Sequence, residues 1–397
     1  MKKIISILLV MIMIIITLPL VYAEDSNTYE TGDIIQFGSY PQTEIKDEEL
    51  IYELNSLCPE WSDWISYGYY SDYNNTNSVE QGDWMRYTDV SINGLKYRGV
   101  KFTQNRNIPQ RKNGYRVDTI YWFKFEPIEW RILDPVSCIV MCEITIDSQP
   151  YSTTIYKDSS ISDSTYAYFN NSAYTSYAND YETSSIRRWL NDDFYNTAFT
   201  DIEKREIDTI TLNNDSYGTC VGDMEYETFN SNSTNDKIFL LSYNEVTNNS
   251  FGFSPDCDDF DAARYSHTTD YAKCQGISDY YGVSQIHHGN TKWLLRTPGN
   301  RSDCVCYVNI QGIATYNDSE GNYCYTYDCW GIRPALKLIQ NDSSDEQPYN
   351  CDCICHDRGI LGFIYRIFRA IKILLNVDLL SKILHIDWLC DCGIAHY

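Results

Sequence analysis

The sequence predicts an α+β fold: a small antiparallel sheet with two main helices and long loops, followed by a small Cys/His-rich helical tail. Short apolar segments rich in β-branched and aromatic residues are separated by turn signals, which is typical of antiparallel strands. One segment, 184–194, has the apolar spacing of a helix. The 35 tyrosines, together with abundant Asn, Ser, Thr and Asp, favour β structure with long polar loops.

Residues 1–23 have the features of a secretory signal peptide. Lys2 and Lys3 precede an almost wholly apolar run over 4–20, and the small residue Ala23 ends a cleavage signal. An uncleaved membrane anchor is the alternative, because this run is close to the shortest that spans a bilayer. Both interpretations predict that the protein is secreted or held at the cell surface.

The N-terminal half predicts several strands. Residues 32–38 and 96–102 each form an expected strand, and 39–42 an expected turn. The chain from 60 to 90 predicts a loop. Segments 121–125 and 128–133 predict two strands paired around Pro127, and 139–146 continues the β pattern.

The two main helices are predicted further along the chain. Ser184 caps the first, whose apolar face is Ile186, Trp189, Leu190 and Phe194. The second spans 270–275 and stops at Gly276. The remaining expected strands and turns are 237–242, 293–299, 304–308 and 331–336.

The formal net charge is −24, and removal of Lys2 and Lys3 with the signal peptide makes it −26. The tail 351–397 carries five basic and five acidic residues, so the excess acid lies in the body. Such a body repels nucleic acid, and we expect no nucleic-acid partner. It favours solubility and the binding of cations.

Several segments in order resemble the DUF6273 family of uncharacterised extracellular domains of clostridia and their relatives. The similar segments are GDIIQFGSYPQ (32–42), YWFKFEPIEWRILD (121–134), SSIRRWLNDDFYNTAF (184–199), DKIFLLSYNEV (236–246), DYAKCQG (270–276), WLLRTPG (293–299) and GIRPALKL (331–338). The resemblance implies a body over 121–340, on which an N-terminal β/loop region (24–120) packs. A polar linker, 341–350, precedes the tail.

The end of the body also resembles, distantly, the C-type-lectin-like fold of the formylglycine-generating-enzyme class. There too a Trp/Arg-containing strand leads to a final G-[FVI]-R strand. The resemblance implies a fold and no activity by itself. Trp293, Arg296 and Arg333 are the candidate ligand-binding residues, and structural packing is their alternative role.

Formylglycine-generating enzymes bind copper with a cysteine pair spaced like Cys324 and Cys329, so the resemblance implies a copper/thiol oxidoreductase as one alternative. Residues five apart on a regular strand face opposite sides, however, so both thiols reach one metal only through a bulge or bend. A surface-loop disulfide or two unrelated thiols is the other interpretation.

The remaining polar motifs in the body leave their roles open. Cys304 and Cys306 lie on one strand face, as do Cys138 and Cys142, so each favours a bridge to a neighbouring strand or a buried apolar position. Segment 255–261 holds four carboxylates and predicts either a Ca²⁺ loop or a solvated loop in which Asp261 caps a helical turn. His287 and His288 are half of a metal site or part of an exposed loop. No Ser/His/Asp order, P-loop or HExxH motif is present, so we assign no catalytic residue.

The tail holds two Cys/His clusters joined by a basic amphipathic segment. Ile360, Ile364, Ile367 and Ile371 follow helical spacing, with arginines and a lysine interleaved. The candidate zinc ligands are Cys351, Cys353, Cys355, His356, Cys390, Cys392 and His396. Zinc coordination and a disulfide staple both remain open. The connecting helix fits a membrane surface or a partner helix.

The sequence leaves three functions open. The favoured one is a non-enzymatic, secreted or surface-held protein that binds an extracellular glycan or protein, with a tail for attachment or assembly. The alternatives are the copper/thiol oxidoreductase and a structural surface protein cross-linked through its odd cysteine, since the chain has 15.

Overall fold

The structure is a computed structural model, and it describes residues 29–58, 65–67, 85–102, 108–152, 179–222, 230–277, 287–299, 304–316, 324, 326 and 330–339. The chain divides into two compact units, residues 1–340 and 341–397. Every described residue belongs to the first unit. Among these residues, no helix is long and apolar enough to cross a membrane.

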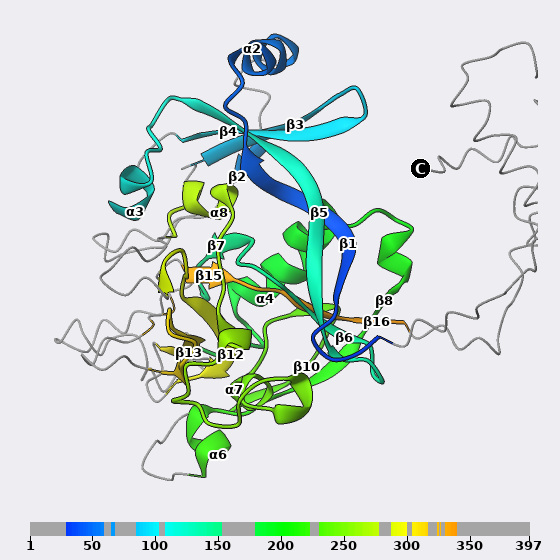
Figure 1. The fold of residues 1–397 in the computed structure, drawn as a ribbon, viewed down its shortest axis with the longest axis vertical. Coiled ribbons are helices and arrows are strands. Elements are labelled where there is room, and N and C mark those ends of the chain that lie inside the picture. The colour runs from blue at the N-terminus through cyan, green and yellow to red at the C-terminus, as the bar shows by residue number, and fades with distance from the viewer. Residues whose placement is uncertain are drawn as a thin grey trace, which may run out of the picture. The chain divides into compact units, whose positions relative to one another are not determined.

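The largest sheet is built around one long antiparallel pair (Figure 1). Strand β5 (Ile120–Asp134) pairs with β1 (Ile34–Glu44) along most of its length. The main order of this nine-stranded sheet is β11-β16-β6-β5-β4-β3-β2, with β1 joined to β5 and β8 to β16. Its other strands are β2 (Ile65–Tyr67), β3 (Met85–Ile92), β4 (Leu95–Phe102), β6 (Ile139–Cys142), β8 (Ile207–Asp208), β11 (Ile238–Phe239) and β16 (Ala335–Leu338).

A second sheet has five strands in the order β14-β13-β12-β15-β7, and β9 and β10 form a separate pair. Only β12 and β15 run parallel among the strand pairs in the described part of the chain; Trp293 is opposite Gly331. These strands are β7 (Asp147–Gln149), β9 (Ile210–Asn214), β10 (Ser231–Asp236), β12 (Trp293–Pro298), β13 (Val305–Val308), β14 (Ala314–Thr315) and β15 (Trp330–Ile332).

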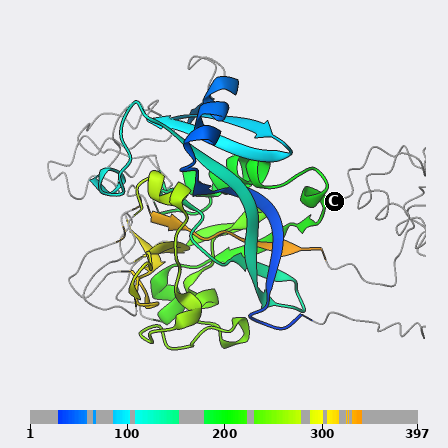
Figure 2. The same cartoon turned by 45° about the horizontal axis from the view of Figure 1, so that its top comes forward.

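The helices are short, and α2 covers the end of the first sheet that β3 and β4 form (Figures 1 and 2). Leu54 of α2 packs there with Ile92, Tyr97 and Trp122, as a small core of its own. The helices are α2 (Glu48–Leu57), α3 (Ile108–Lys112), α4 (Ser185–Trp189), η2 (Leu190–Phe194), α5 (Tyr195–Ala198), η3 (Glu203–Arg205), α6 (Tyr217–Val221), α7 (Tyr243–Val246), η4 (Asn249–Phe251), η5 (Ala262–Arg264) and α8 (Asp270–Cys274).

The expected pair of strands around Pro127 is wrong, because 120–134 is one continuous strand. On one edge of β5, β4 pairs with residues 120–124 and β6 with 130–134. Pro127 falls in the gap between these two partners, and on the other edge it is opposite Ser39 next to a register shift. A proline has no N–H to donate, so it is tolerated where the ladder is interrupted.

The expected turn at 39–42 is also wrong, since β1 continues to Glu44. Register shifts lie between Gln36 and Ser39 and between Pro41 and Thr43. Gly38 has φ of 71°, and a Cβ there would lie 2.6 Å from the Phe199 ring. These bulges absorb the turn-forming residues without ending the strand, and they bend it around the body.

Three smaller expectations need correction. The loop expected over 60–90 contains β2 and the start of β3. Strand β6 ends at Cys142 rather than 146, and Cys138 lies in the preceding turn with φ of 56°. The four-residue spacing of these cysteines therefore does not place them on one strand face. Helix α2 was not predicted from the sequence.

The helix expected from Ser184 is confirmed and extends to Ala198. The Ser184 side chain accepts a hydrogen bond from the backbone of Arg187, and the expected apolar face is buried. The middle turn, η2, is a π-helix. The second expected helix is present as α8. The dominance of antiparallel strands over a few helices confirms the α+β class.

Candidate functional site

A polar hollow of about 450 Å³ lies where the start of the α4–η2 helix meets the end of β10. All of its lining residues are polar or charged. They are Glu182, Thr183, Ser184, Ser185, Arg187, Arg188, Asn191, Asp192, Asn235 and Asp236. Such a lining suits a ligand rich in hydrogen-bonding groups, because its side chains both donate and accept hydrogen bonds.

The amphipathic pattern of the helix explains why these residues gather. Ile186 and Leu190 are fully buried in the main core, so the polar residues between them face away from it. Just before the helix, Asp180 accepts hydrogen bonds from the Glu182 backbone and the Thr183 hydroxyl. These bonds fix the entry of the chain into α4.

An ion pair with a buried carboxylate lies in the lining of the hollow. Arg187 Nε donates to Asp236 Oδ1 at 2.6 Å, and the Asp236 side chain is only 1% exposed. The other carboxylate oxygen accepts from the Thr234 hydroxyl at 2.7 Å. Arg187 also donates to the backbone carbonyls of Glu182 and Asn235, so its guanidinium is held from several sides.

Asn191 connects the helix to the strand that follows the hollow. Its Oδ1 accepts from the backbone N–H groups of Lys237 and Ile238, and its Nδ2 donates to the Ile238 carbonyl at 2.9 Å. The side chain therefore pairs with this backbone much as a neighbouring strand would. Asn191 lies in the π-helical turn, and π-helical turns are frequent at functional sites.

The three residues proposed as ligand-binding lie elsewhere and are buried. Arg296 is 2% exposed and donates to both carboxylate oxygens of Glu245, as well as to the Leu240 carbonyl at 2.7 Å. Burial opposes the ionisation of Glu245, but the Arg296 charge and its hydrogen bonds outweigh this and lower the pKa of Glu245. Arg296 thus ties β12 to the N-terminus of α7.

Trp293 and Arg333 are fully buried and pack against each other. The Arg333 guanidinium lies over the Trp293 ring, 4.8 Å from its centroid. It donates to the carbonyls of Cys142 and Glu143, at 3.0 and 2.8 Å. Burial lowers the pKa of Arg333 to about 10. A ligand-binding role for these three residues stays a prediction, and their contacts are those of residues that join the two sheets.

A second polar cluster surrounds Asp147, which is fully buried. Tyr40 donates to one carboxylate oxygen at 2.6 Å. The other oxygen accepts from the side chains of Gln149 and Gln275 and from the backbone of Ser148. Burial raises the pKa of Asp147 and outweighs these hydrogen bonds, which act in the opposite direction. The cluster joins β1, β7 and α8 in the interior.

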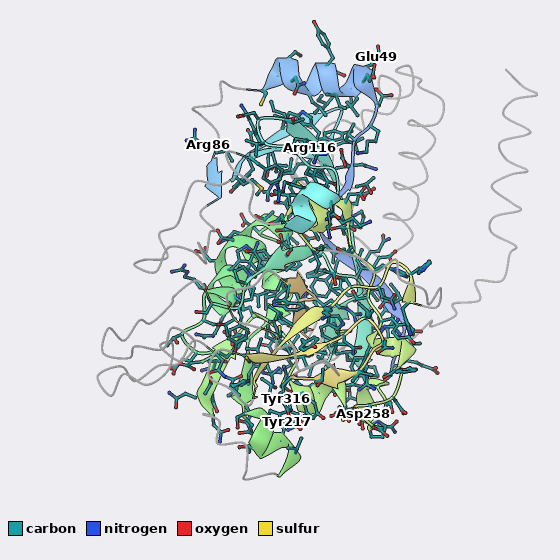
Figure 3. The ribbon with its side chains drawn as sticks, turned by 90° about the vertical axis from the view of Figure 1, so that its left-hand side faces the viewer. Glu49, Arg86, Arg116, Tyr217, Asp258 and Tyr316 are labelled. Carbon is teal, nitrogen blue, oxygen red and sulfur yellow. The ribbon has the colours of Figure 1, made fainter. Side chains whose placement is uncertain are left out.

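The acidic segment 255–261 brings some of its carboxylates together. Ligand atoms of Asp256, Cys257 and Asp258 lie within 4.8 Å of one another. Asp261 caps η5 by accepting from Ala263, as the solvated-loop interpretation expects. Figure 3 shows Asp258 at the same end of the molecule as Tyr217 and Tyr316, whose rings lie 4.5 Å apart. Calcium binding here stays a prediction.

Nine of the cysteines lie in the described part of the chain, and no disulfide joins any two of them. Cys304, Cys306 and Cys324 are buried, whereas Cys329 lies outside the described residues. His287 is 6% exposed and packs edge-on against Tyr265, so the exposed-loop interpretation is wrong for this histidine. His288 is exposed.

All seven candidate zinc ligands of the tail lie outside the described residues, as does the expected signal peptide. Zinc binding and a disulfide staple therefore stay alternative predictions.

The family described as "Domain of unknown function (DUF6273)" matches residues 139–340, just over half of the chain. The chain therefore belongs to the DUF6273 family. The matched region includes the hollow and both expected helices, and it begins after β5. No curated protein and no solved structure matches the chain.

Sequence reasoning missed the hollow, although one signal was available. The segment SSIRRWLNDDF carries adjacent arginines and acids on the face opposite its apolar residues. The pattern does not reveal that Asn235 and Asp236 close the other side, because nothing local relates them to Arg187, 49 positions away in the case of Asp236.

Proposed function

We propose that this DUF6273 protein is a non-enzymatic, secreted or cell-surface protein that binds an extracellular glycan in the hollow at α4–η2 and β10. A protein ligand is the other candidate. Residues 351–397 would attach or assemble the protein, with zinc or disulfides holding the two Cys/His clusters. We also propose that the body is related to the C-type-lectin-like fold. The parallel pairing of β12 with β15 supports this relation, because it places the strand that contains Trp293 and Arg296 beside the final Gly331–Arg333 segment.

The observation that carries the proposal is the entirely polar lining of the hollow. Sugars present many hydroxyl groups, which both donate and accept hydrogen bonds, and the lining offers amides, hydroxyls, carboxylates and guanidinium groups. Its volume of about 450 Å³ falls within the range of small-ligand sites. The Arg187–Asp236 pair holds two of the lining residues together, which reduces the ordering that binding would require.

An oligosaccharide array probed with the full chain after signal removal tests this proposal. We expect binding to at least one glycan, and we expect Thr183→Trp to weaken it by about 10-fold or more, because the indole fills space that the ligand needs. Thr119→Trp, at an exposed position outside the hollow, is the matched control. A blank array, or equal binding by the two variants, would contradict the proposal.

A further inference from the structure

Arg188 differs from the other residues that line the hollow. Within the described part of the chain, its exposed guanidinium makes no hydrogen bond and no ion pair. The other charged residues of the lining each have a partner: Arg187 pairs with Asp236, Glu182 accepts from Asn232, and Asp192 accepts from Asn196. Arg188 is thus the charged group whose hydrogen-bonding capacity is left for a ligand.

We infer that the hollow is selective for glycans that carry a carboxylate, as uronic-acid residues do, and that Arg188 binds this carboxylate. The inference rests on the proposed function and names its ligand class. A guanidinium is planar, stays charged at physiological pH and offers a fork of N–H donors that matches the two oxygens of a carboxylate. Neutral sugars would leave this fork without a charged partner.

The neighbouring acids favour a carboxylate over a phosphate. Asp192 lies in the lining, and Arg188 and Asp192 both act electrostatically on Asp193, the next residue of the helix. Each negative charge near Arg188 repels an incoming anion, and the repulsion grows with the charge of that anion. A carboxylate carries one charge, whereas a phosphate monoester carries nearly two at neutral pH.

The remaining lining favours a sugar over a peptide as the carrier of the carboxylate. Thr183, Asn191 and Asn235 present hydroxyl and amide groups, and the lining has no apolar side chain. Peptide ligands usually gain affinity from side chains that enter apolar pockets, and hydroxyl-rich ligands do not need them.

Binding of two matched oligosaccharides to the full chain after signal removal tests the inference. One is a galactose oligosaccharide that carries a single galacturonate residue, and the other is the wholly neutral galactose oligosaccharide of the same length and linkage. We expect the acidic probe to bind about 10-fold or more tightly than the neutral one, because hydrogen bonds to charged groups are stronger than neutral ones. Added salt should reduce the difference.

Arg188→Gln should reduce the ratio of acidic-probe to neutral-probe affinity to about one, while Arg188→Lys should retain part of the preference. Arg205→Gln is the matched control, because Arg205 is also an exposed arginine, it lies outside the hollow, and its replacement changes the net charge equally. A loss of preference in both variants would assign it to the overall charge and overturn the role of Arg188.

The two proposals fail in distinguishable ways. If the two probes bind equally and Thr183→Trp weakens both, the carboxylate inference is overturned but glycan binding in the hollow is supported. Equal binding of an acidic peptide of the same charge would overturn the glycan class. Binding of neither probe, with binding on the array only to neutral glycans, would overturn the carboxylate inference alone. A wholly blank array would overturn both proposals.

Discussion

Two groups of arginines in the DUF6273 region have opposite surroundings. Arg296 and Arg333 are buried, and each guanidinium group contacts backbone carbonyls and a carboxylate, that of Glu245 for Arg296 and that of Glu143, at 4.0 Å, for Arg333. Arg187 and Arg188 lie at the hollow, where Arg187 pairs with the buried Asp236, whereas the Arg188 guanidinium makes no ion pair or hydrogen bond with the described residues. The partners of an arginine, rather than the motif that contains it, separate a structural residue from a candidate binding residue.

The largest effect on stability is expected at Arg296. Replacement by Met leaves Glu245 without its charged partner in a site where burial opposes ionisation. Breaking a buried ion pair from one side typically costs about 3–5 kcal/mol. We therefore expect a loss of this size in the free energy of unfolding, measured by chemical denaturation.

Glu245→Gln with Arg296→Met is the informative control, because the double variant removes the unpaired charge and should recover part of the loss. Arg188→Gln should change stability by less than about 0.5 kcal/mol, as surface substitutions usually do. Equal losses at Arg296 and Arg188 would erase the distinction between the two groups.

A smaller effect is expected at Asp147, whose carboxyl is buried but receives only uncharged donors. Asp147→Ala leaves the Tyr40 hydroxyl and two glutamine amides without this acceptor, at a cost of about 1–3 kcal/mol. Asp147→Asn keeps an oxygen acceptor, and the Tyr40 hydroxyl can rotate to accept from its amide, so the loss should be smaller.

The difference in stability between the wild type and Asp147→Asn should depend on pH with a definite sign. Burial raises the folded-state pKa of Asp147 above its unfolded value. Below the unfolded pKa, about 3.9, both states are protonated and there is no penalty. As pH rises from there to the folded pKa, the unfolded state loses its proton first, so the wild type loses stability relative to Asp147→Asn. A relative gain for the wild type over this window, in denaturation at several pH values, would contradict the raised pKa.

Sequence reasoning succeeded where periodicity is local. The strand expected over 96–102 and the helix expected from the apolar stripe of 184–194 are both present, because the signals for each element lie in neighbouring residues. It failed at β1 and β5, because Pro41 and Pro127 are typical turn residues that the sheet accommodates at interruptions of its ladder. The pairing of Arg296 with Glu245 could not be predicted, because the two residues are far apart in the sequence and meet only in the folded chain.

A modest loss of stability is expected at Ser184, which caps α4 and lines the hollow. Ser184→Ala should cost about 1 kcal/mol, as losses of N-caps typically do. Ser242, which caps α7 in a capping box outside the hollow, is the matched control and should lose a similar amount when replaced by Ala. Glycan binding should weaken for Ser184→Ala and not for Ser242→Ala, because only Ser184 fixes the start of the helix that carries Arg187 and Arg188. Binding that changes equally in both variants would mean that affinity follows overall stability, and that the hollow has no special place in recognition.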